Sequence, residues 1–229
     1  MKKSLYGSCC LGFLLASCAS AGEGLAPAQG EIDRSLASAV YFDVDQSQLP
    51  AQHREKVVRA VLQVDETFPA EPFLARLKAK SDWTFTEPAA TGDELVRRVR
   101  DRQDENDATV RPRLSFYTPP GWGKDTCGGW SFGPFRRTSS TGCTDNAGNI
   151  KISLEHISND PTAVAEFLAH EWMHAADYRH GDNNNQHTAQ KRNSVPIHVG
   201  CLVRSYPNTS RMDLCALSLK DAQEQTSLP

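Results

Sequence analysis

The 229-residue sequence contains no long run of lysine or arginine, and its formal net charge is −3. Nucleic-acid-binding proteins carry clustered basic residues that neutralise phosphates, so the composition argues against a nucleic-acid partner. No internal repeat is visible, and hydrophobic residues make up 39% of the chain. These properties are typical of a soluble, mildly acidic globular protein with one sizeable core.

The apolar run near the N-terminus, within MKKSLYGSCCLGFLLASC, is too short to span a bilayer as a helix. Two lysines precede it and small residues follow it, which is typical of a signal peptide. Its end, LASC at 15–18, resembles the lipobox of bacterial lipoproteins, and this resemblance implies cleavage before Cys18 and lipidation of that cysteine. The predicted segments are a signal peptide at 1–17, a tether at 18–30 and a single domain at 31–229, of which 31–110 is a possible N-terminal helical subdomain.

The lipobox resemblance also implies a location. We expect a protein that is lipid-anchored in the bacterial cell envelope, with no other membrane attachment. Ala19 follows the cysteine where inner-membrane lipoproteins carry Asp, which favours the outer membrane. If the lipobox is not used, an ordinary signal ending at Ala19 or Ala21 would make the protein periplasmic or secreted.

No two cysteines of the predicted domain have C-x-x-C spacing, which argues against a cysteine-bound zinc ion. Four cysteines remain in this domain, and an even number in an exported protein indicates two disulfides. The pairs Cys127–Cys143 and Cys201–Cys215 are favoured among the three possible pairings because both loops are short.

Hydrophobic periodicity and turn residues predict a mixture of helices and strands, and therefore an α+β fold. Asp160 and Pro161 have the positions of a helix cap and a first helical residue, so a further helix is expected to run through AVAEFLAHEWMHAA. The other predicted elements are helices at 50–64, 71–80, 91–103 and around 214–219, strands at 83–86, 113–117 and 149–157, and a long loop at 118–149.

The segment HEWMHAADYRHGD, at 170–182, concentrates the chemically active side chains. His170 and His174 are four residues apart, which places both imidazoles on one face of a helix, close enough to bind one ion. Glu171 lies about 100° further round the helix, so it can reach a water molecule beside the ion and accept its proton. This H-E-x-x-H pattern predicts one Zn²⁺ per chain, with Glu171 as general base.

The same segment resembles the H-E-x-x-H-x-x-G-x-x-H signature of the metzincin clan of zinc metallopeptidases. The resemblance implies His180 as third ligand and a zincin-like α+β fold, with a small mixed sheet and a long active-site helix carrying the motif. It also implies a peptide or protein substrate, hydrolysed by a metal-activated water, and a cleft edged by the strand at 149–157. The clan's methionine turn beneath the metal would correspond to Met212.

The sequence departs from this signature at Asp177, which occupies the glycine position. The turn there usually requires a positive φ, which Asp tolerates better than most residues. The departure leaves Asp177 or Asp182 as alternative third ligands, and His187 or His198 as further candidates.

Two functional hypotheses follow. The first is a monomeric, lipid-anchored zinc peptidase. The second is a non-catalytic envelope lipoprotein, a binding or scaffold module with a structural or degenerate zinc site. Aromatic residues in the loop region fit either a substrate groove or a small satellite core: Trp122, Trp130, Phe132 and Phe135.

Overall fold

The computed structural model describes residues 29–81, 83, 86–87, 90–132, 137–138, 141–157, 160–180 and 194–215. The predicted signal peptide and Cys18 lie outside these residues. Helix α1 begins at Gln29, within the last two residues of the predicted tether. The elements in chain order are α1 (Gln29–Ala37), β1 (Asp43–Val44), η1 (Gln46–Gln48), α2 (Ala51–Thr67), α3 (Glu71–Ala79), β2 (Thr86–Glu87), α4 (Gly92–Asp101), β3 (Arg113–Tyr117), β4 (Trp122–Lys124), β5 (Trp130–Phe132), β6 (Arg137–Thr138), β7 (Gly142–Thr144), β8 (Ile150–Ser153), α5 (Leu154–Ile157), α6 (Pro161–Ala175), β9 (Arg179–His180), α7 (Val195–Ser205) and α8 (Thr209–Cys215).

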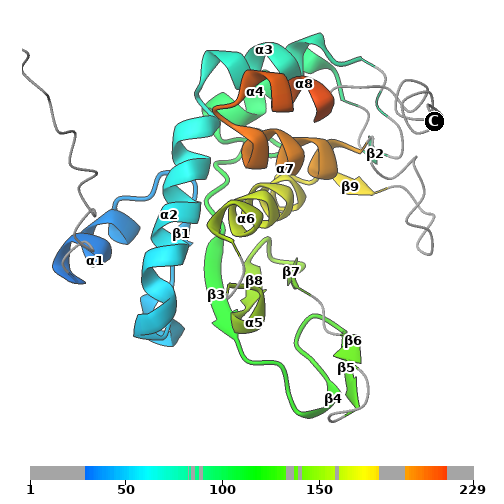
Figure 1. Cartoon of the computed structure of the whole chain (residues 1–229). Coiled ribbons are helices and arrows are strands. Elements are labelled where there is room, and N and C mark those ends of the chain that lie inside the picture. The colour runs from blue at the N-terminus through cyan, green and yellow to red at the C-terminus, as the bar shows by residue number, and fades with distance from the viewer. Residues whose placement is uncertain are drawn as a thin grey trace, which may run out of the picture.

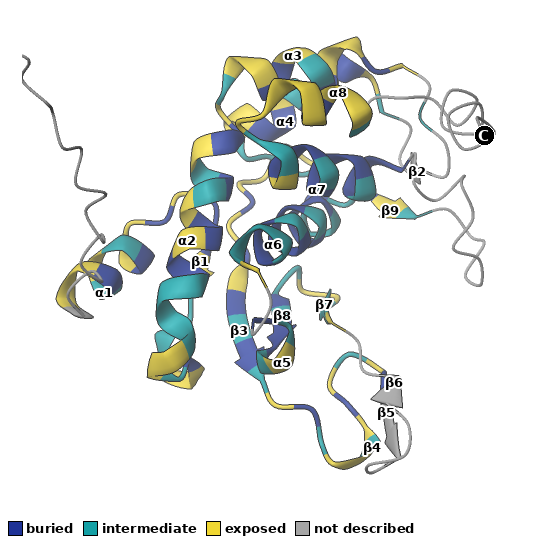
Figure 2. Cartoon of the chain, viewed as in Figure 1, coloured by how far each residue is buried: buried dark blue, intermediate teal, exposed yellow. Residues whose placement is uncertain are grey.

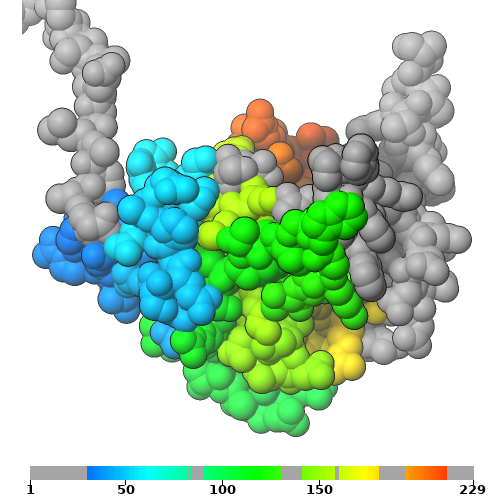
Figure 3. All heavy atoms as spheres, turned by 90° about the horizontal axis from the view of Figure 1, so that it is seen from below, coloured from blue at the N-terminus to red at the C-terminus, as the bar shows by residue number. Residues whose placement is uncertain are grey.

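The predicted α+β class is confirmed. The described residues form eight α-helices and a four-stranded sheet of order β1-β3-β8-β7, in which β7 alone is antiparallel to its neighbour. Helix α6 packs against α2, α7 and the sheet, and α3, α4 and α8 gather beyond α7 (Figure 1). Figure 3 shows the molecule from below, with cyan atoms towards the left of this face and green atoms in its centre. Helix α6, which carries the H-E-x-x-H motif, is therefore central to the fold.

A single hydrophobic cluster joins residues from α1 to α8, so 31–110 packs into the same core as α6 (Figure 2). At its centre Trp172 of α6 is fully buried. Its ring meets Tyr41 and Phe68 edge-on at centroid distances of 5.6 Å and 5.3 Å, a geometry that favours aromatic pairs. In the part of the chain that the structure describes, no helix is long and apolar enough to cross a membrane.

The two main predicted strands had different outcomes. Strand β3 matches its predicted bounds, and its alternating pattern buries Leu114 and Phe116. The strand predicted at 149–157 is shorter, because β8 ends at Ser153 and α5 follows. The Ser153 hydroxyl accepts a hydrogen bond from the N–H of Glu155 at 3.3 Å, and this local bond favours a helical turn over continued strand.

The prediction of a long loop at 118–149 was wrong, since this region contains β4 to β7. Two hairpin turns organise it, Asp125–Gly128 and Asp145–Gly148. In each turn the aspartate Oδ1 accepts hydrogen bonds from the N–H groups two and four residues later. Gly128 and Gly148 have φ of 86° and 77°, which only glycine adopts without steric cost.

Both predicted cysteine pairs are confirmed. Cys127–Cys143 ties the β4–β5 turn to β7, and Cys201–Cys215 ties α7 to α8. The two bridges close loops of similar length, with sequence separations of 16 and 14. They therefore provide matched variants for a stability measurement.

We expect the double variant Cys127→Ser/Cys143→Ser to lose about 3 kcal/mol of unfolding free energy, because the unfolded chain regains the entropy of an open loop. Urea unfolding, monitored by circular dichroism, measures this loss of unfolding free energy. The variant Cys201→Ser/Cys215→Ser is the matched comparison, with an expected loss of similar size. An unchanged unfolding midpoint in either variant would contradict the presence of that bridge.

Candidate metal centre

Helix α6 presents the H-E-x-x-H motif on its last two turns. The predicted start is confirmed: Asp160 caps the helix by accepting a hydrogen bond from the N–H of Thr162, and Pro161 opens it. The opposite side of α6 is anchored in the core by buried residues such as Leu168 and Trp172. This anchoring fixes which face of the helix carries His170 and His174.

The structure brings His170, His174 and His180 together. The Nε2 atom of His170 lies 3.2 Å from the Nε2 atoms of both His174 and His180. The three ligand atoms all lie within 4.8 Å of one another, so this cluster could hold a metal ion. Tetrahedral zinc with Zn–N bonds of 2.0–2.1 Å requires nitrogen atoms about 3.3 Å apart, and the two separations of 3.2 Å fit that requirement.

Two hydrogen bonds orient the imidazoles. The Nδ1–H of His174 donates to the backbone carbonyl of Tyr178 at 2.6 Å, which leaves a lone pair on its Nε2. The Nδ1 atom of His180 lies 2.9 Å from the hydroxyl of Ser194, the buried residue that precedes α7. Partners of this kind set the tautomer of ligating histidines and increase their basicity.

The electrostatic surroundings favour neutral imidazoles. Burial lowers the pKa of His170 well below its ordinary value, and the neighbouring His174 and His180 lower it further. Burial also lowers the pKa of His174, although its hydrogen bond to Tyr178 opposes the shift. A neutral imidazole retains the lone pair that a metal needs.

Glu171 is held beside this cluster by Thr144 of β7. The carboxylate Oε2 lies 2.8 Å from the Thr144 hydroxyl, which is also 3.0 Å from the backbone carbonyl of Glu171. Burial raises the pKa of Glu171 to about 7, and the hydrogen bonds with Thr144 partly offset the increase. A carboxyl group with a pKa near neutrality is suited to both accepting and returning a proton.

The chain turns at Asp177, where the metzincin signature has glycine. The N–H of Asp177 donates to the carbonyl of His174, and the N–H of Tyr178 donates to that of Met173, each at 3.0 Å. These two bonds form a Schellman motif, whose left-handed residue is usually glycine. Asp177 adopts this conformation with φ 70°, so the predicted positive φ is confirmed.

We expect Asp177→Gly to leave zinc affinity within about threefold of wild type, because Asp177 shapes the turn and lies outside the histidine cluster. The free energy of unfolding should change by less than about 1 kcal/mol, since relief of the left-handed strain is offset by a more flexible unfolded chain. Zinc titration and urea unfolding measure the two quantities. Loss of zinc in this variant would instead identify Asp177 as a ligand.

A cleft of about 500 Å³ opens at the cluster, bounded by α6, the turn at Asp177 and β7 with its following turn. The predicted edge role of 149–157 was wrong, because β8 pairs with β3 on one side and β7 on the other. Strand β7 is the edge strand on this side of the sheet. At Gly142 a β-carbon would lie 2.3 Å from both Phe167 of α6 and the Lys151 carbonyl, so only glycine permits this close approach.

None of the other predicted site residues that the structure describes belongs to the histidine cluster. His198 is buried in α7 and meets the Trp83 ring edge-on at 5.2 Å, outside the cluster. Met212 is buried in helix α8, which packs against α7 and α3. Trp122 is 67% exposed on β4. The remaining candidates lie outside what the structure describes: Asp182, His187, Phe135 and the side chains of Trp130 and Phe132.

Two residues that contact the candidate site were missed from the sequence. Thr144 contacts Glu171 from a position 27 residues earlier, and Ser194 contacts His180 from 14 residues later. The sequence S-V-P at 194–196 does indicate a helix start, which would have identified Ser194 as a residue before a helix. Nothing in the local pattern links either residue to the motif.

Comparison of the chain with protein-family models, curated proteins and solved structures gives no significant match.

Proposed function

We propose that this protein is a zinc-dependent peptidase with a zincin-like active site of the metzincin type. The observation that carries the proposal is the cluster of three histidines, in which Nε2 of His170 lies 3.2 Å from Nε2 of both others, beside a buried glutamate at a cleft. His170, His174 and His180 would hold the ion. A zinc ion with three imidazole ligands retains an open position and supplies Lewis-acid activation of water.

The chain's own residues provide the remaining chemistry. Glu171 accepts a proton from the attacking water and later donates it to the leaving amine, for which its pKa of about 7 is suited. Thr144 holds the carboxylate in place for both transfers. The outer edge of β7 borders the cleft, so an extended peptide can bind there by adding a strand to the sheet.

The proposed location is the bacterial cell envelope, with a lipid anchor at Cys18 and a monomeric domain beyond it. The two disulfides support export, because such bridges persist in oxidising compartments. Radiolabelled palmitate would be incorporated into the wild type and absent from Cys18→Ser if the anchor is used.

The test of the proposed function is cleavage of a peptide library by the zinc-loaded protein. We expect new termini to appear at reproducible sites, and expect cleavage to stop when a chelator removes zinc and to resume when zinc is restored. The variant His170→Ala/His174→Ala is the control for contaminating proteases. Stoichiometric zinc without any cleavage would favour the non-catalytic binding module.

Thr144→Val is expected to reduce kcat/KM by about 10- to 100-fold, which is the value of a hydrogen bond to a charged group. Because the Thr144 hydrogen bonds lower the pKa of Glu171, their loss raises that pKa. The base must be deprotonated, so the acidic limb of the pH–rate profile should move to higher pH. Thr144→Ser retains the hydroxyl and should preserve the wild-type profile; a Thr144→Val profile that does not move would exclude this role.

A further inference from the structure

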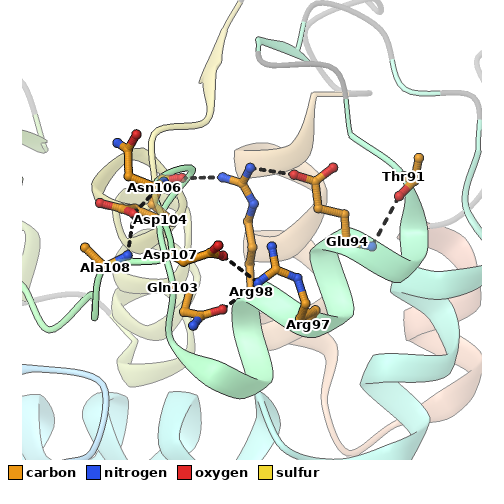
Figure 4. A network of polar contacts seen from close by, with 10 residues as sticks. Thr91, Glu94, Arg97, Arg98, Gln103, Asp104, Asn106, Asp107 and Ala108 are labelled. Carbon is orange, nitrogen blue, oxygen red and sulfur yellow. Dashed lines mark hydrogen bonds and ion pairs between the residues drawn. The ribbon is translucent and has the colours of Figure 1, made fainter.

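Arg98 of α4 is a buried cation close to the candidate metal centre. Its side chain is only 5% exposed, and it forms an ion pair with Glu94 one helical turn earlier. A buried charge is costly unless it is paired and hydrogen-bonded. Figure 4 shows the guanidinium group directed away from the axis of α4, with Glu94 on one side.

On its other side the guanidinium group contacts the turn that follows α6. Its NH1 group donates to the carbonyl of Ala176 at 3.4 Å, and its carbon lies 5.0 Å from the centre of the Tyr178 ring. Ala176 is the C-cap residue of α6. At this end of a helix the carbonyl groups lack helical partners, and a nearby cation is favourable. Arg98 therefore contacts both neighbours of Asp177.

The turn held by Arg98 carries a partner of the metal cluster. The carbonyl of Tyr178 accepts the hydrogen bond from Nδ1 of His174 at 2.6 Å, and His180 follows two residues later. Asp177 between them has the left-handed conformation that a non-glycine residue adopts only at a cost. The contacts of Arg98 with Ala176 and Tyr178 restrict the backbone conformations that this turn can adopt.

We propose that Arg98 is a positioning residue, which holds the turn at Ala176–Tyr178 and through the Tyr178 carbonyl orients the imidazole of His174. The effect of this role on zinc binding rests on the proposed function, whereas the orientation of His174 does not. It explains how α4, distant in sequence, contributes to the site. It also accounts for a buried arginine in a helix whose adjacent arginine, Arg97, is 46% exposed and pairs with Asp107 (Figure 4).

The first measurement is made on the metal-free full chain. In wild type the Nδ1–H of His174 should give a slowly exchanging ¹⁵N-coupled proton signal, identified by its absence in His174→Ala. Arg98→Met should lose or broaden this signal, whereas Arg97→Met, the matched control, should retain it. If Arg98→Met does not fold, Arg98→Lys serves in its place, because the ammonium group keeps the charge but lacks the planar contact with Tyr178.

The second measurement is zinc affinity, determined by competition with a chromophoric chelator. Arg98→Met should bind zinc about 10- to 100-fold more weakly, as is typical when the orientation of a ligating histidine is lost. Arg98→Lys should fall between it and the wild type, and the visible spectrum of the cobalt-substituted protein should change in both variants. An unaltered His174 signal in the arginine variants would overturn the proposal. A wild type that binds no zinc would instead overturn the proposed function, since the His174 signal is read without metal.

Discussion

Glu171→Gln is expected to reduce kcat for peptide hydrolysis by about 10²- to 10⁴-fold, the contribution typical of a general base. Glutamine has nearly the same shape, and its amide oxygen can still accept the hydrogen bond from Thr144. Its amide cannot take a proton from water at neutral pH. Zinc content should therefore remain at one ion per chain while the rate of cleavage falls.

Steady-state assays on a peptide identified from the library measure this loss, together with zinc content on the same sample. Glu166→Gln is the matched control, because Glu166 lies on the same helix but pairs with Arg204 at its surface. That variant should keep the wild-type rate. Full activity in zinc-loaded Glu171→Gln would remove Glu171 from the mechanism and, with it, the principal support for a metzincin-type reaction.

The second large effect is expected for His180→Ala, which should weaken zinc binding by more than about 100-fold. Loss of a hydrogen-bond partner of a metal ligand typically weakens metal affinity by up to about 100-fold. His180 is proposed to be a ligand itself, so its loss should have a larger effect. Its Nε2 lies 3.2 Å from that of His170, so its removal opens one side of the cluster. Added zinc should raise the Tm of the wild type and should have little effect on the Tm of the variant.

Competition with a chromophoric chelator and thermal unfolding with and without zinc provide the two readouts. His53→Ala is the control, since His53 lies on α2 outside the cluster. If His180→Ala retains wild-type affinity, Asp177 or Asp182 becomes the third ligand. The variants Asp177→Asn and Asp182→Asn would then identify which of the two it is.

The local elements could be predicted from the sequence because their signals lie within a few residues. Asp160 and Pro161 mark the start of α6, and the spacing of His170 and His174 places them on one helix face. The two disulfides follow from short separations. Even the Asp177 turn was foreseeable, because a left-handed residue at a helix end is a local requirement.

The errors in the fold arose where local signals were weak. The two D-x-x-G turns are present at 125–128 and 145–148, but the strands that they join are only three or four residues long and show little periodicity. The sequence of this region therefore predicts a loop. The choice of β8 as the edge strand failed for a different reason: strand order depends on which partners the sheet finds, and β7 occupies the position at the end.

Local sequence was sufficient to predict the motif, its helix and the residue types that can bind a metal, since helical geometry converts a four-residue spacing into a shared face. Tertiary packing alone brings His180 to the other two histidines and Thr144 to Glu171. It also brings Ser194 to His180 and Arg98 to the carbonyl of Ala176. Those contacts join residues from separate elements. They depend on how α4, α6, α7 and β7 pack around one core, which the order of residues within any single element does not specify.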